Sequence, residues 1–144
     1  MASQEGISKD QTVASGTDER LATQTIGETL ERMKECSLFL ELIRKADMQH
    51  LLRVSGLRTL FAPRNDALRD VAAEDAEELV NKHVASGSME TFDLRRAKTV
   101  QNAAGEKLAV EAKDGTFRVG SASIVRSDIA CTNGVIHVVD AVIS

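Results

Sequence analysis

The chain has 144 residues, of which 42% are apolar and 28% charged, so its length suits one globular domain with or without a tail. Its aromatic residues are four phenylalanines, with no tyrosine or tryptophan, which argues against a nucleic-acid groove built from stacking rings. The formal net charge of −4 likewise argues against a surface that follows a phosphate backbone. We therefore expect no nucleic acid among the partners, and no apolar run is long enough to predict a membrane span.

Residues 1–20 predict a flexible N-terminal tail. They are rich in Ser, Gln, Gly and acidic residues, and too few are apolar to offset the entropy lost on ordering. Residues 21–144 are expected to form a single domain. The first residues lack the basic start and apolar stretch of a secretory signal, which leaves the native compartment open.

Apolar residues with helical spacing predict three helices in the first half of the chain. The expected helices cover residues 25–33, 37–46 and 74–84. Thr25 and Ser37 are the expected caps of the first two, and acidic residues load the N-terminal end of the third, where they complement the helix dipole. A buried strand is expected at residues 58–62, followed by a helical turn that Asn65 or Asp66 caps.

After Gly87 the pattern changes to strands. The expected strands cover residues 98–102, 107–112, 116–119, 122–126 and 135–143. The Asp-Gly pair at 114–115 and the Asn-Gly pair at 133–134 are typical of hairpin turns, while the basic run 95–98 predicts a solvated loop or strand edge. The last strand is apolar on both faces, which indicates a central strand covered on both sides. Helices followed by strands predict an α+β domain.

No set of side chains in the sequence matches an enzyme signature. The three histidines, His50, His83 and His137, lack metal-ligand spacing, and no nucleophile elbow, phosphate loop or dinucleotide fingerprint is found. His83 and His137 are better explained as hydrogen-bonded structural residues. We therefore expect a non-enzymatic protein with no metal or other cofactor. Cys36 and Cys131 favour buried free thiols, although a disulfide stays open if the fold brings them together.

Two segments resemble the signature blocks of fasciclin-like domains. The first, Thr-Leu-Phe-Ala-Pro-Arg-Asn-Asp-Ala-Leu at 59–68, is similar to the block Thr-x-Phe-Ala-Pro-Thr-Asn-x-Ala-Phe. The second, Asn-Gly-Val-Ile-His-Val-Val-Asp-Ala-Val at 133–142, is similar to Asn-Gly-Val-Ile-His-Val-Ile-Asp-x-Val. The resemblance runs from about Thr25 to the C-terminus. The signature positions expected to have structural roles are Thr59, Phe61, Ala62, Pro63, Asn65, Asn133, Gly134, His137 and Asp140.

The resemblance implies a compact wedge, with β-sandwich-like sheets and several helices packed on one side. It also implies an adhesion module, of the compact bacterial type, that is extracellular, on the cell surface or in the periplasm and recognises a protein or surface ligand. His83, Asp128 and Ile129 match positions in two segments that animal members use in cell attachment, so they are candidate partner-binding residues. Lys82 replaces the aromatic residue beside His83, which argues against integrin binding.

Two alternatives to adhesion stay open at this stage. One is a small ligand-binding or catalytic protein whose cleft lies between helices and sheet, and a pocket with convergent polar groups would favour it. The other is an intracellular regulatory protein. The partner and the oligomeric state are not specified by the sequence.

Overall fold

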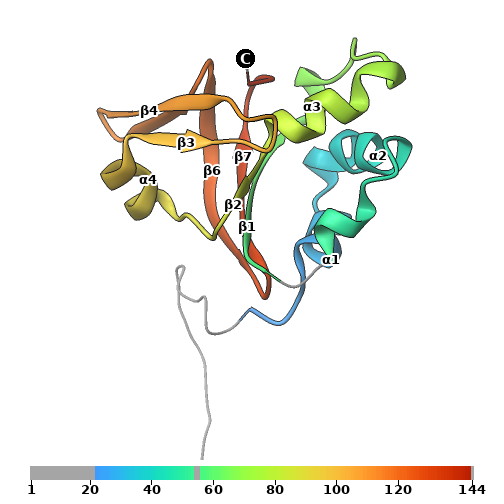
Figure 1. Cartoon of the computed structure of the whole chain (residues 1–144), viewed down its shortest axis with the longest axis horizontal. Coiled ribbons are helices and arrows are strands. Elements are labelled where there is room, and N and C mark those ends of the chain that lie inside the picture. The colour runs from blue at the N-terminus through green and yellow to red at the C-terminus, as the bar shows by residue number, and fades with distance from the viewer. Residues whose placement is uncertain (1–21, 54–55, 144) are drawn as a thin grey trace, which may run out of the picture.

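A seven-stranded sheet organises the protein, in the order β2-β1-β7-β6-β5-β4-β3 (Figure 1). The computed structural model describes residues 22–53 and 56–143, so the tail expected at residues 1–20 lies outside the described residues. The strands are β1 (Arg58–Pro63), β2 (Val84–Ser86), β3 (Thr99–Gln101), β4 (Lys107–Lys113), β5 (Thr116–Val119), β6 (Ala122–Cys131) and β7 (Gly134–Val139). Neighbouring strands are antiparallel except β1 and β7, which are parallel.

The two ends of this sheet meet. A bridge joins Ala85 of β2 to Asn102, the residue after β3, and the amide of Ala103 donates to the carbonyl of Val84 at 2.8 Å. The sheet is therefore nearly a closed barrel, which leaves little of its edge strands unpaired. The resemblance predicted β-sandwich-like sheets, and the structure has one sheet folded back on itself.

Helices lie on both sides of the sheet. They are α1 (Ile26–Glu31), α2 (Ser37–Lys45), α3 (Ala76–Lys82) and α4 (Thr91–Ala97), with short 3₁₀ turns η2 (Lys34–Cys36), η3 (Gln49–Leu52), η4 (Asn65–Ala67) and η5 (Ala73–Asp75). The first three α-helices form one layer, and α4 lies beside β3 and β4 at the other end of the molecule (Figure 1). The predicted α+β class is confirmed.

The central strand β7 separates two apolar cores. Ile136 and Val138 belong to the core shared with the helical layer, whereas Val139 belongs to the core inside the barrel and under α4. Successive strand residues point to opposite faces, so a strand buried on both faces is mostly apolar, and His137 is the one polar side chain of β7. All six residues of β7 are buried, as expected from the sequence.

Helix α4 was not expected, because the pattern after Gly87 predicts strands and residues 95–98 predict a loop or strand edge. The helix buries only Leu94, so it has no apolar stripe that periodicity could detect. It depends on local caps instead: Glu90 and Asp93 form a capping box, and Lys98 ends the helix in the left-handed region at φ 66°.

The predicted role of Asn65 is also wrong in one respect. Its side chain does not cap the turn η4, in which it lies. Asn65 Oδ1 instead accepts the amide of Leu38 at 2.8 Å, and its Nδ2 donates to the carbonyl of Lys34 at 2.9 Å. Asn65 thus caps the start of α2 from the neighbouring turn η4, while Ser37, the expected cap, is the first residue of the helix.

Replacing Gly134 by alanine should destabilise the fold by about 3 kcal/mol, because the new Cβ would overlap the carbonyl oxygen of Arg58 on the paired strand β1. Gly134 also has φ 154°, at the limit of the region that favours glycine. The matched control is Gly105→Ala, which has φ 86° but open space around the added Cβ and should lose about 1 kcal/mol. Urea unfolding measures both, and equal losses would contradict the close approach.

Candidate functional site

His83 lies at the C-terminal end of α3, and its imidazole is fully buried. Its Nε2 accepts the amide of Ile143 at 3.0 Å, so the ring proton is on Nδ1, which donates to the carbonyl of Leu79 at 2.7 Å. The ring of Phe39 meets it edge-on at 5.8 Å. Burial lowers the pKa of His83 to about 4, so the ring is neutral at pH 7. The imidazole joins the C-terminal segment to α3 and does not reach the surface.

His137 and Asp128 form a second polar group on the barrel side of β7. The buried ring of His137 accepts the amide of Asp128 on Nδ1 at 3.1 Å, and its Nε2 donates to the carbonyl of Met89 at 2.8 Å. The ring of Phe61 stacks on it at 5.7 Å. Burial lowers the pKa of His137, against the opposing effects of its bond to Met89 and of the nearby Asp128 carboxylate.

Asp128 places the start of α4. Strand β6 changes register on both sides of Arg126, and Asp128 itself lies at φ 59°, which turns its side chain toward the helix. One carboxylate oxygen accepts the amide of Thr91 at 2.8 Å and the other accepts its hydroxyl at 2.7 Å. These charge-assisted bonds secure the first turn of a helix that buries little. The next residue, Ile129, is half-buried and packs against the helical core.

Phe92, the residue after Thr91, is 65% exposed. The guanidinium of Arg96, one turn along α4, lies over its ring at 5.6 Å. Sequence reasoning did not select Phe92, because a lone phenylalanine in a polar segment carries no periodic signal. Its position next to the Asp128–Thr91 contact brings it close to one of the residues that the resemblance did select.

The other polar signature residues are also engaged inside the molecule. Thr59 Oγ1 donates to the carbonyl of Gly87 at 2.6 Å and accepts the amide of Met89 at 2.8 Å. Asn133 Oδ1 accepts the amide of Ile26 at 2.8 Å. Asp140 accepts the amide of Ser123 at 2.9 Å. These side chains tie loops and helix starts to β1 and β7, so their visible roles are structural.

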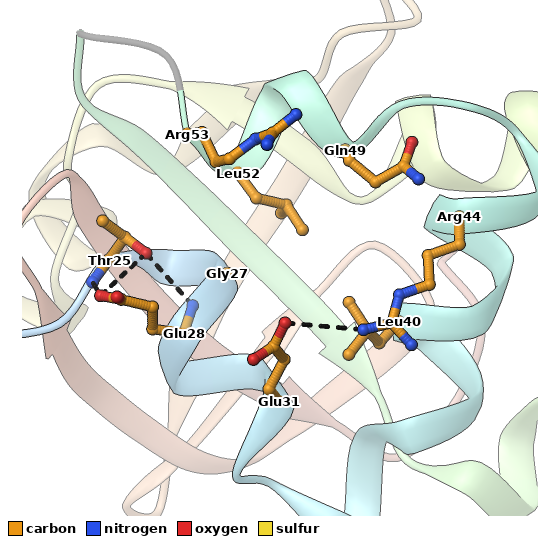
Figure 2. A pocket seen from close by; sticks show the side chains of 9 residues that line it. All are labelled: Thr25, Gly27, Glu28, Glu31, Leu40, Arg44, Gln49, Leu52 and Arg53. Atoms are coloured by element: carbon orange, nitrogen blue, oxygen red, sulfur yellow. Dashed lines mark hydrogen bonds and ion pairs between the residues drawn. The ribbon is translucent and has the colours of Figure 1, made fainter.

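A groove of about 380 Å³ lies among α1, α2 and η3 (Figure 2). Leu40 and Leu52 line its apolar part, and Glu31 pairs with Arg44 across it at 3.5 Å. Arg53 extends along its rim (Figure 2). Helical elements alone enclose this groove, in contrast to the cleft between helices and sheet considered as an alternative.

The described residues contain no group of three or more His, Cys, Asp or Glu placed to hold a metal ion. Cys36 and Cys131 are separate free thiols. Burial raises the pKa of Cys36 to about 12 and also raises the pKa of Cys131. Neither thiol is therefore disposed to form the reactive thiolate at neutral pH.

None of the helices among the described residues has the length and hydropathy needed to cross a bilayer.

The sequence profile of the Fasciclin domain matches residues 34–144. The chain belongs to the fasciclin-domain family. Protein sll1483 from Synechocystis sp. is 31% identical to it over 99% of this chain and 84% of that protein. Human periostin is 32% identical over 83% of this chain, but the chain spans only 16% of periostin.

A solved structure shares the fasciclin fold with this chain. It is the FAS1 domain pair from the insect cell adhesion molecule fasciclin I, with a TM-score of 0.75 and 18% identity over 94% of this chain and 54% of that chain. At this identity the likeness concerns the fold alone. The family expected from the two signature blocks is confirmed.

We expect His137→Ala to lower the free energy of unfolding by about 1–3 kcal/mol, because the Met89 carbonyl and the Asp128 amide lose their partner in a buried place. His50, which is exposed, provides the matched control, and His50→Ala should stay within about 0.5 kcal/mol of the wild type. Thermal or urea unfolding measures both variants. A His137→Ala protein as stable as the control would contradict the structural role.

Stability should fall as the pH is lowered from about 6.5 to about 4, the interval between the ordinary pKa of histidine and that of buried His83. In this interval His83 binds a proton in the unfolded chain but stays neutral in the folded protein. Unfolding therefore becomes more favourable, by about 3 kcal/mol in total. Above pH 6.5 this stabilising contribution is fully present. Urea titrations at several pH values measure the slope, which His83→Gln should reduce and His50→Gln should not. Equal slopes in all three proteins would contradict this assignment.

Proposed function

We propose that this fasciclin domain is a non-enzymatic adhesion or binding module that recognises a protein or surface ligand with the surface at the start of α4. We define this surface by Phe92 and Asp128. The observation that carries the proposal is the exposed ring of Phe92, next to the helix turn that Asp128 holds in place. An aromatic side chain on an ordered backbone loses little conformational entropy when a partner covers it, and such residues are frequent binding hot spots.

The internal hydrogen bonds support binding over catalysis. Both ring nitrogens of His83 and of His137 are engaged inside the protein, which leaves neither imidazole available as a general base. Burial raises the pKa of both thiols, which disfavours a cysteine nucleophile. Of the three residues suggested by the resemblance, Asp128 acts by ordering α4, whereas Ile129 packs against the helical core. His83 acts from inside, by holding the end of α3.

We also propose an extracellular, cell-surface or periplasmic setting for this domain. The solved structure that shares its fold comes from an insect cell adhesion molecule. Relatives that are much longer than this chain, such as periostin, contain this domain as one part, so we do not transfer their partners.

A second candidate function is binding of a small ligand in the groove of Figure 2. Its volume of about 380 Å³ lies within the range of ligand pockets, and its two arginines and two glutamates could orient a polar molecule. The two candidates use different faces, so variants can separate them.

Phe92→Ser should reduce capture of partners from an envelope extract of the source organism by at least ~10-fold, because a hot-spot aromatic contributes this much or more. The immobilised full chain serves as bait, and captured proteins or glycans are quantified. Leu57→Ser is the matched control, since Leu57 is another large exposed apolar residue at 55%. Full capture by Phe92→Ser would contradict the α4 surface. Loss with Arg53→Glu alone would favour the groove.

A further inference from the structure

A cluster of basic side chains and a cluster of acidic side chains lie at opposite ends of the molecule, with Asp114 beside the first and Arg69 beside the second. We call Arg95, Arg96, Lys98 and Lys113 the basic pole; all four are exposed, on α4 or at the tip of the β4–β5 hairpin. We call Asp70, Glu74, Asp75, Glu77 and Glu78 the acidic pole; all five are exposed, around η5 and α3. Figure 1 shows α4 at one end of the long axis and α3 at the other.

The two arginines of the basic pole each lie over an aromatic ring. The guanidinium of Arg95 lies over Phe117 at 5.5 Å, and that of Arg96 lies over Phe92 at 5.6 Å. Among the described residues, none of the four cations of the basic pole takes part in an ion pair. A guanidinium stacked on a ring keeps its N–H edges free for hydrogen bonds.

A groove with an apolar floor lies within the acidic pole. Its volume is about 330 Å³; Val71, Leu79 and Val142 contribute apolar surface, and Asp70, Asp75 and Glu78 stand around it. Lys82 is the one cation that lines it, and Glu78 already pairs with this ammonium at 3.8 Å. The groove is large enough for an aromatic side chain, and its rim attracts cations.

We propose that the groove at α3 binds the α4 end of a second copy of this chain, with Phe92 inserted and Arg95 and Arg96 facing the carboxylates. This inference rests on the proposed function, because it names the partner of the same α4 surface. Charge complementarity favours this occupant. The exposed ring of Phe92 lies on the same helix as the guanidiniums of Arg95 and Arg96, and the groove combines apolar side chains with three carboxylates. One chain thus carries both the inserted side chain and the groove that would receive it.

The placement of the two poles determines the kind of assembly. They lie at opposite ends of the molecule, so they do not meet within one chain (Figure 1). A contact between different surfaces of two copies leaves one free end of each kind, so further copies add head to tail, in an open chain or, if the rotation closes, in a ring. One groove and one ring form a small interface, which we expect to be weak and sensitive to salt.

Sedimentation velocity of the purified full-length protein tests this inference. At about 20 mM NaCl the weight-average sedimentation coefficient should rise with protein concentration up to about 1 mM, and about 0.5 M NaCl should return it to the monomer value. Phe92→Ser should weaken the association by ~10-fold. A wild type that stays monomeric at low salt would overturn the proposal.

Charge reversal provides the sharper test. The double variant Arg95→Glu/Arg96→Glu should be monomeric, and so should Asp75→Lys/Glu78→Lys, because each variant loses the attracting charges on one side of the contact. A mixture of the two variants should associate again, since one offers basic ends and the other acidic ends. The matched control is Arg32→Glu/Lys34→Glu, which makes the same charge change at exposed positions of the helical layer and should associate like the wild type.

The outcomes separate this inference from the proposed function. A mixture that stays monomeric, or a dimer that ignores both reversals, would overturn self-association while capture of a foreign partner through Phe92 stands. Association that both reversals abolish and the mixture restores would support it. Circular dichroism of each variant confirms that the fold is intact before sedimentation.

Discussion

The parallel pairing of β1 with β7 is the constraint on which the rest of the structure depends. These two strands carry the two signature blocks, and their register places Phe61 beside His137 and Arg58 beside Gly134. The backbones come so close at Gly134 that a Cβ has no room there. Parallel neighbours need a long connection, and here the chain between them forms α3, α4 and five further strands. Every other element is therefore placed relative to this pair.

Two neutral imidazoles, those of His83 and His137, link this central strand pair to other segments, one on each side of it. The amide of Phe61 donates to the carbonyl of His83 at 2.8 Å, while the ring of Phe61 stacks on His137. His83 then holds the C-terminal segment, and His137 holds the loop before α4 and the bulge at Asp128. Each ring accepts one backbone amide and donates to one backbone carbonyl, which only the neutral form can do. Burial also lowers the pKa of both rings, so folding favours their neutral form and stability falls when the pH is lowered.

The parts of the fold that could be predicted are those that sequence patterns encode locally. Strand β7 is apolar on both faces, and the helices of the first layer show helical spacing, so both follow from side-chain periodicity. Helix α4 could not be found in this way, since it buries one residue and is held by capping and by Asp128, which is distant in sequence. The cap that Asn65 provides to α2 also links separate segments. Such contacts depend on tertiary placement, which periodicity does not report.

The difference between local sequence patterns and tertiary contacts also matters for the candidate partner-binding residues. The resemblance selected His83, Asp128 and Ile129, and the structure places the imidazole inside, the carboxylate against Thr91 and the isoleucine half-buried. His83 and Asp128 therefore stabilise the scaffold, because their side chains are hydrogen-bonded to the backbone of their own chain, and Ile129 contributes to the packing of the core. Under the proposed function, partner choice lies with side chains that the scaffold holds at the surface but does not use, such as Phe92 and the arginines of the same helix. These positions lie outside both signature blocks. Proteins that share the blocks can therefore share this fold and still bind different partners.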